Sequence, residues 1–84
     1  MENQETRVAL ISIIVHDMSQ TEELNRLLHT YSGYIIGRMG IPYPTKDINI
    51  IGIALDAPQD AISALSGKIG RLPGVTSQAV LSQY

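Results

Sequence analysis

Two histidines are the residues of this 84-residue chain best suited to acid–base or metal chemistry. His16 precedes Asp17, and a carboxylate beside an imidazole can orient a metal ligand or a general base. One such pair does not make a metal site, because zinc takes three or four protein ligands, and the chain has no cysteine. Ser12 would complete the residue types of a triad, but no nucleophile elbow surrounds it. We therefore expect no metal, no cofactor and no catalytic residue.

Other polar residues lie on the first expected helix and on the strand after it. His29 follows Asn25 by four residues, so both flank the leucine stripe of that helix and could line a cleft at its edge. Arg38 is the only charge inside the second expected strand. It could bind a carboxylate or phosphate, pair across a subunit boundary, or protect an edge strand from aggregation. The segment Ser66-Gly67-Lys68 lacks the full spacing of a phosphate loop and is better explained by helix packing.

The strand from Thr6 to Val15 or His16 is apolar on both alternating faces, which predicts a central strand covered on both sides. The elements that carry these residues must therefore pack around it. The other expected elements are a helix after the capping box Ser19–Glu22, a strand over Tyr34–Ile41, a strand over Ile48–Leu55, a helix opened by Asp56-Ala57-Pro58, and a strand over Val75–Leu81. The prolines of the 42–47 loop are expected to stop the second strand. Simple alternation there places Ile35, Met39 and Ile41 on one face, and Ile36 and Arg38 on the other.

The order βαββαβ predicts an α+β protein, the ferredoxin-like sandwich, with an antiparallel sheet of order 4-1-3-2 and both helices on one face. The strand compositions agree, because strands one and three, at the centre, are apolar on both faces. We expect a flexible tail over residues 1–5 and a single domain over residues 6–84.

The face of the sheet opposite the helices would expose several large aliphatic side chains from strands one, two and three. An exposed apolar patch of that size usually marks an interface. A chain of 84 residues without cysteine also lacks the disulfides that support many small domains. We therefore predict a homo-oligomer, a dimer or a tetramer, formed through the open sheet face.

Charge and hydropathy exclude several classes of partner. The formal net charge is −2 and no basic patch appears, so we expect no nucleic acid. The longest apolar run is far shorter than the about 18 residues of a membrane span, so we expect no membrane. The polar, acidic start of the chain lacks the features of a signal peptide, which predicts a cytoplasmic protein.

Three segments together resemble the iron-only hydrogenase system regulator family. They are Asn25-x-x-Leu28-His29, Arg38-x-Gly40-x-Pro42, and Ala64-Leu65-Ser66-Gly67-Lys68-x-Gly70 followed by Gly74-Val75. The resemblance implies an ACT-like oligomeric regulator, and it favours Asn25, His29, Arg38 and Lys68 as a ligand-binding cleft. That family is similar to the C-terminal domain of the nickel-responsive regulator. Its nickel site is not carried over, because this chain has no cysteine and no histidine cluster, and we expect no direct DNA binding.

Three functions remain open at this point. The first is a homo-oligomeric ACT-like regulatory module that senses a small ligand or binds a partner protein. The second is a small enzyme with a site at a subunit interface, using His16 and Asp17 or His29 and Arg38. The third is a structural assembly protein without a ligand.

Overall fold

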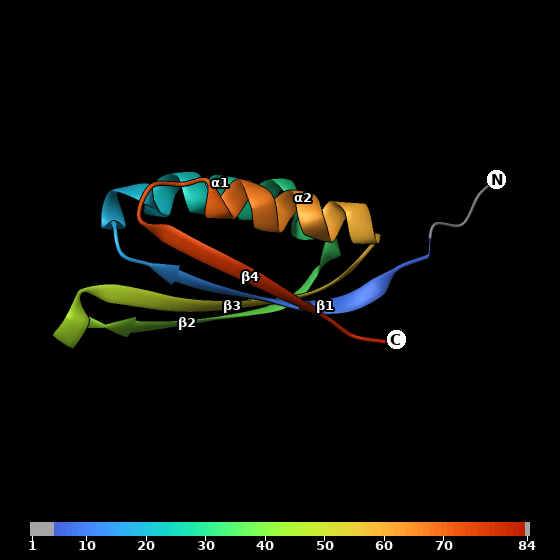
Figure 1. The fold of residues 1–84 in the computed structure, drawn as a ribbon, viewed down its shortest axis with the longest axis horizontal. Coiled ribbons are helices and arrows are strands. Elements are labelled where there is room, and N and C mark those ends of the chain that lie inside the picture. The colour runs from blue at the N-terminus through green and yellow to red at the C-terminus, as the bar shows by residue number, and fades with distance from the viewer. Residues whose placement is uncertain (1–4, 84) are drawn as a thin grey trace.

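The computed structural model describes residues 5–83, so the expected tail, except for Glu5, lies outside the described residues. A four-stranded antiparallel sheet carries two helices on one face, as Figure 1 shows. The elements are β1 (Arg7–Val15), α1 (Thr21–Thr30), β2 (Ile35–Tyr43), β3 (Ile48–Ala57), α2 (Gln59–Gly70) and β4 (Val75–Leu81), with short 3-10 turns at Met18–Gln20, Ser32–Tyr34 and Pro44–Lys46. The predicted α+β, βαββαβ fold is confirmed.

The sheet order is β2-β3-β1-β4, which is the expected order 4-1-3-2 counted from the other edge. β1 and β3 occupy the centre because only they are strongly apolar on both faces. Their antiparallel register places Ile11 opposite Ile53 and Ile13 opposite Ile51. Since opposite residues of a ladder point to the same face, these pairs form one side of the sheet.

The core lies between that side of the sheet and the two helices. Ile11, Ile13, Ile53 and Leu55 are fully buried. The helices complete the core with Leu24 and Leu28 from α1 and Ile62, Leu65 and Ile69 from α2. Each buried aliphatic side chain of this size contributes roughly 1.5–3 kcal/mol relative to an exposed one. The helix-covered face is therefore the part of the molecule that holds the single chain together.

A β-bulge at Ile36 makes the face assignment of the second strand wrong. Ile35 pairs with Leu55, but Gly37 pairs with the next residue of β3, Ala54, so Ile36 is an extra residue. Beyond the bulge, Arg38 pairs with Ile53 and therefore faces the helices together with Ile35. Met39 and Ile41 face the open side of the sheet instead of sharing a face with Ile35.

The second strand also continues past its expected end. Pro42 pairs with Asn49 and Tyr43 pairs with Ile48, so β2 ends at Tyr43 and not at Ile41. Proline is tolerated here because β2 is an edge strand, where a missing N–H interrupts no second ladder. The strand consequently presents Gly40 and Pro42 beside Arg38 on the helix side.

The first helix begins differently from the expected capping box. The Asp17 carboxylate accepts hydrogen bonds from the Ser19 backbone N–H at 3.0 Å and from the Ser19 hydroxyl at 2.6 Å. These bonds start the Met18–Gln20 turn, and they lower the pKa of Asp17. Gln20, just before α1, makes no side-chain cap. The second helix is likewise uncapped by a side chain, because Pro58 precedes it and Asp56 belongs to β3.

Two turns meet at the end of the sheet where β1 finishes and β4 starts. The His16 backbone N–H donates to the Gly74 carbonyl at 2.7 Å. Gly74 has φ +68°, a conformation that L residues rarely adopt. A Cβ at this position would lie 2.7 Å from the Asp17 Cβ. Glycine at position 74 therefore allows both the backbone conformation and the close approach of the two turns.

Candidate functional site

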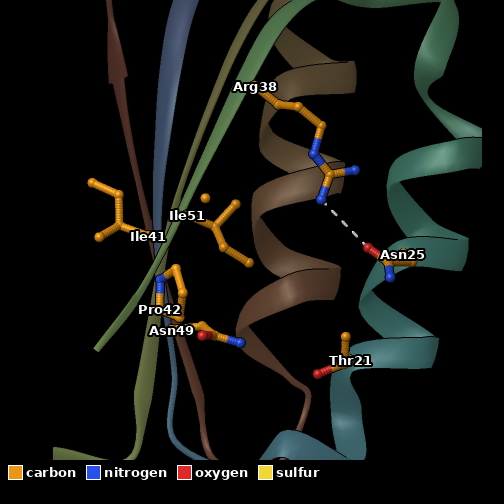
Figure 2. A pocket seen from close by; sticks show the side chains of 8 residues that line it. Thr21, Asn25, Arg38, Ile41, Pro42, Asn49 and Ile51 are labelled. Atoms are coloured by element: carbon orange, nitrogen blue, oxygen red, sulfur yellow. Dashed lines mark hydrogen bonds between the residues drawn. The ribbon is translucent and has the colours of Figure 1, made fainter. Parts of the chain in front are cut away.

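A groove runs between α1 and the edge strand β2, with a pocket of about 370 Å³ near the start of the helix. Figure 2 shows Arg38 reaching from β2 toward α1, with Ile41 on the other side of the sheet. The side chains and backbone that line the pocket come from α1, β2 and β3. They are Thr21, Asn25, Arg38, Gly40, Ile41, Pro42, Asn49 and Ile51.

Helical spacing and the β-bulge together position the polar side chains of this groove. Thr21, Asn25 and His29 recur every four residues, so they follow one side of α1. The bulge at Ile36 turns Arg38 to the same side of the sheet as the helix. Gly40 leaves space beside Arg38, because a Cβ built on it would meet nothing within 4 Å. An open channel with polar side chains along one wall results where an apolar helix–sheet contact would otherwise close.

Arg38 crosses the groove. Its guanidinium donates to the Asn25 Oδ1 at 3.4 Å, a long hydrogen bond to a neutral acceptor (Figure 2). Within residues 5–83 the single ion pair joins Arg26 and Glu23 elsewhere on α1, where the carboxylate raises the pKa of Arg26. The charge of Arg38 is therefore not neutralised by a carboxylate of the described chain.

A second pocket of about 310 Å³ continues the groove on the other side of Arg38. It is lined by Asn25, Leu28, His29, Ser32, Ile35 and Arg38. The two pockets share Asn25 and Arg38, so the bridge between these side chains divides one groove into two compartments. Three of the four candidate residues, Asn25, His29 and Arg38, thus line one continuous feature.

Lys68 lies outside this groove. Its Nζ donates to the Tyr31 hydroxyl at 2.9 Å and lies 5.2 Å from the centre of the same ring. Lys68 therefore links α2 to the end of α1 through a hydrogen bond and a cation–π contact. The four candidate residues do not form one cluster in the single chain.

Two polar side chains of the pocket, Thr21 and Asn49, were not among the candidates. Thr21 precedes Asn25 by four residues, so the helical spacing that linked Asn25 to His29 could have included it. Asn49 is the one strongly polar residue of the expected strand Ile48–Leu55, but only the pairing of Asn49 with Pro42 brings it to the groove. Its Nδ2 donates to the Met18 sulfur at 3.3 Å.

The other residues considered for chemistry lie apart from the groove. Ser12 pairs with Gly52 on the open face of the sheet, and the Asp17 carboxylate is occupied by Ser19. Across the described residues 5–83, no three His, Cys, Asp or Glu side chains come together as metal ligands. In the same part of the chain, neither helix is long and apolar enough to cross a bilayer.

Comparisons with known proteins give one family. Residues 7–79 match the TM1266-like family, described as "Iron-only hydrogenase system regulator, putative". The solved structure of the uncharacterized protein TM1266 from Thermotoga maritima is 34% identical, with a TM-score of 0.90 over 94% of this chain and 100% of that one. No curated protein matches the chain.

A second solved structure resembles the chain in fold alone. The C-terminal domain of the MgtC protein from Mycobacterium tuberculosis has a TM-score of 0.73 at 12% identity, over 100% of this chain and 96% of that one. The family match and the TM1266 structure, in contrast, cover nearly the whole described sequence. The chain belongs to the TM1266-like family of iron-only hydrogenase system regulators.

Proposed function

We propose that this chain is a regulatory module of an iron-only hydrogenase system that assembles with copies of itself and senses a small molecule. The family description supplies the regulatory role. Self-association through the open face of the sheet supplies the assembly, and the α1–β2 groove supplies the place for the small molecule. The apolar character of the open face is the observation that carries the proposal.

The open face contains what we call the sheet patch, a set of aliphatic and methionine side chains that are each between 36% and 62% exposed. Its members are Val8, Leu10, Ile14, Met39, Ile41, Ile50 and Val80. Ladder pairing makes the patch continuous, since Leu10 lies opposite Val80 and Ile14 lies opposite Ile50. Monomers rarely leave so many adjacent apolar side chains in water, and burying the exposed half of each contributes about 1 kcal/mol.

The shape of the patch also favours a second copy. A hollow of about 270 Å³ lies on the open face, lined by Leu10, Gly37, Met39, Gly52 and Ala54 and by Arg38, whose guanidinium points to the helix side. The two glycines lack side chains, and the surrounding residues are mainly apolar. An apolar sheet face with such a hollow can take a protruding side chain from an identical face, because a two-fold interface uses the same patch twice.

Sedimentation velocity at micromolar concentration tests the assembly. We expect the unmodified chain to sediment as a dimer or larger, and Leu10→Asp to sediment as a folded monomer, because a buried carboxylate without a partner is strongly unfavourable. Ser63→Asp is the matched control, since it adds the same charge on an exposed position of α2. Monomers of the unmodified chain, with native circular dichroism, would overturn the proposed assembly.

Thermal unfolding in the presence of small molecules tests the sensing role. A panel of amino acids, organic acids, nucleotides and divalent metal ions is added to the unmodified chain. A ligand that binds only the folded state raises the Tm by mass action. We expect at least one compound to raise it. A panel without effect would overturn the sensing role and leave partner-protein binding as the way in which the module regulates.

A further inference from the structure

We infer that the α1–β2 groove binds a small organic anion through a carboxylate or phosphate group held by Arg38. This inference names the ligand class of the sensing role proposed above and rests on it. It depends on four features of the groove: an uncompensated charge, additional hydrogen-bond donors, a limited size, and a position away from the sheet patch.

The charge is the first feature. Arg38 makes one 3.4 Å hydrogen bond to the neutral Asn25 amide oxygen. No Asp or Glu is among the residues that line either compartment of the groove. A guanidinium has five N–H donors, so this bond leaves most of them for a ligand. Carboxylates and phosphates match the planar fork of arginine and bind it through two parallel hydrogen bonds.

The neighbouring side chains add donors to the same compartment. Asn25 accepts from Arg38 through Oδ1, so its Nδ2 is the part of the amide that can donate to a ligand. The Thr21 hydroxyl lies on the same side of α1, and Figure 2 shows it on the helix side of the groove, below Asn25. A groove with one cation, an amide donor and a hydroxyl stabilises an anion better than a neutral molecule or a cation.

The volume of the pocket and the apolar part of its lining limit the size and the chemistry of the ligand. A volume of about 370 Å³ lies at the low end of the roughly 300–1,000 Å³ of small-molecule sites. Ile51 and Pro42 give this compartment an apolar wall. The ligand is therefore a small molecule with a short hydrocarbon part beside its charged group. Gly40 is essential to this space, since any side chain there would project beside Arg38.

The position of Arg38 separates ligand binding from assembly. Arg38 pairs with the buried Ile53 and points to the helix side, whereas the sheet patch lies on the opposite face. Sheet-to-sheet association of two copies therefore leaves the guanidinium accessible. An acidic side chain of a second copy is the competing partner for Arg38, and it would leave no affinity for a free anion.

Nuclear magnetic resonance titration of the unmodified, 15N-labelled chain tests the inference. Acetate, succinate and inorganic phosphate serve as probes, with acetamide and a diamine as neutral and cationic comparisons, all at constant ionic strength because salt screens exposed charges. We expect the anions to shift the amide signals of residues 21–29 and 38–41, and the comparisons to leave them unchanged. A larger response to the two organic acids identifies a carboxylate ligand, and a larger response to phosphate identifies a phosphorylated one.

Four variants locate the binding. We expect Arg38→Gln to weaken anion binding at least tenfold and Arg38→Lys to weaken it less, because lysine keeps the charge but not the fork. Gly40→Leu should abolish binding without changing the charge, because it fills the compartment. Arg71→Gln is the control: it removes an exposed positive charge at the end of α2, which packs beside β4 at the opposite sheet edge. It should bind within twofold of the unmodified chain.

The outcomes separate this inference from the proposed function. Equal affinity of Arg38→Gln and the unmodified chain overturns the inference. So does a panel in which only a neutral or cationic compound raises the Tm, a result that leaves the sensing role intact. Sedimentation of the same samples reports assembly independently, so a monomer that binds anions overturns assembly alone.

Discussion

The two faces of the sheet have nearly the same residue types but very different environments. In β1, Ile11 and Ile13 are fully buried under the helices, whereas Leu10 and Ile14, which flank them in the sequence, are 47% and 36% exposed. One strand therefore carries two apolar surfaces, and the chain covers only one of them. Burial inside this fold therefore explains one half of its hydrophobic pattern, and the proposed association of two copies would explain the other half.

Burial differs across the face of the sheet that the helices cover. Over β1 and the second half of β3 the helices close on the sheet, and Ile11, Ile13, Ile53 and Leu55 beneath them are buried. At the β2 edge, Gly40, Pro42 and Arg38 replace large aliphatic side chains, and the α1–β2 groove stays open. The molecule thus has three distinct regions: a buried core, an exposed apolar face, and a groove lined by both polar and apolar side chains.

Truncating one side chain on each face gives the largest expected difference between them. Ile53→Ala should lower the free energy of unfolding by about 2–5 kcal/mol at every protein concentration, because it opens a cavity in the core. Leu10→Ala should lower it by an amount that grows with concentration, since Leu10 would be buried only in the proposed assembly. Urea unfolding at several concentrations measures both. Equal, concentration-independent losses would remove the distinction between the two faces.

Gly74→Ala acts at the end of the sheet, outside both faces. We expect a loss of about 1–3 kcal/mol, because alanine is strained at φ +68° and its Cβ would approach Asp17. Gly33→Ala is the control, since a Cβ there meets nothing within 4 Å. Urea unfolding should separate the two variants, and sedimentation should show native assembly for both. A change of assembly in folded Gly74→Ala would mean that the turns help to form the interface.

Gly67→Ala should stabilise the helix layer alone. Gly67 lies inside α2 with open space around its Cβ position, so alanine gains helix propensity without a clash. The expected gain is about 0.5–1 kcal/mol in the free energy of unfolding. The dissociation constant of the proposed dimer, measured by dilution, should be the same for Gly67→Ala and for the unmodified chain. Tighter association of this variant would indicate that the helices, and not the open face, carry the interface.

The smallest expected effect is a pH dependence of the free energy of unfolding that comes from Asp17, in the turn before the first helix. The bonds from Ser19 hold the pKa of Asp17 below its ordinary value of 3.8, so the folded state binds this proton less readily than the unfolded state. The resulting stability is complete above the unfolded pKa and is lost as the pH falls through the lowered folded pKa. Asp17→Asn should flatten this part of the stability profile measured by urea unfolding. An unchanged profile would assign the acid dependence to other carboxylates.

Much of the fold could be predicted because its signals are local and redundant. The two-sided apolar character of Val8–Val15 and of Ile48–Leu55 predicts central strands, and alternation with two helices then fixes the topology. The approach to α1 is harder to predict, because Asp17 and Ser19 are both good cap residues and lie two positions apart, and Asp17 caps the short turn before the helix. Local sequence cannot choose between them without the path of the chain.

The candidate site depended more on tertiary structure. Helical spacing predicts that Asn25 and His29 share a side of α1, and the structure confirms that both line the groove. Alternation could not bring Arg38 to them, because the bulge at Ile36 changes the phase of β2, although Gly37 beside it is a residue that often marks a bulge. Lys68 fails to join them because the packing of α2 on α1 places it against Tyr31.

The bulge at Ile36 also limits how the length of this gene segment can change. Loss of codon 36 alone would leave a regular ladder with every later residue on its present side of the sheet. Loss of one codon between Arg38 and Ile41 would move every later side chain of the strand to the opposite face of the sheet, so apolar and polar positions would be exchanged. Relatives that differ in length here should therefore show their gap at the bulge and almost nowhere else along that strand.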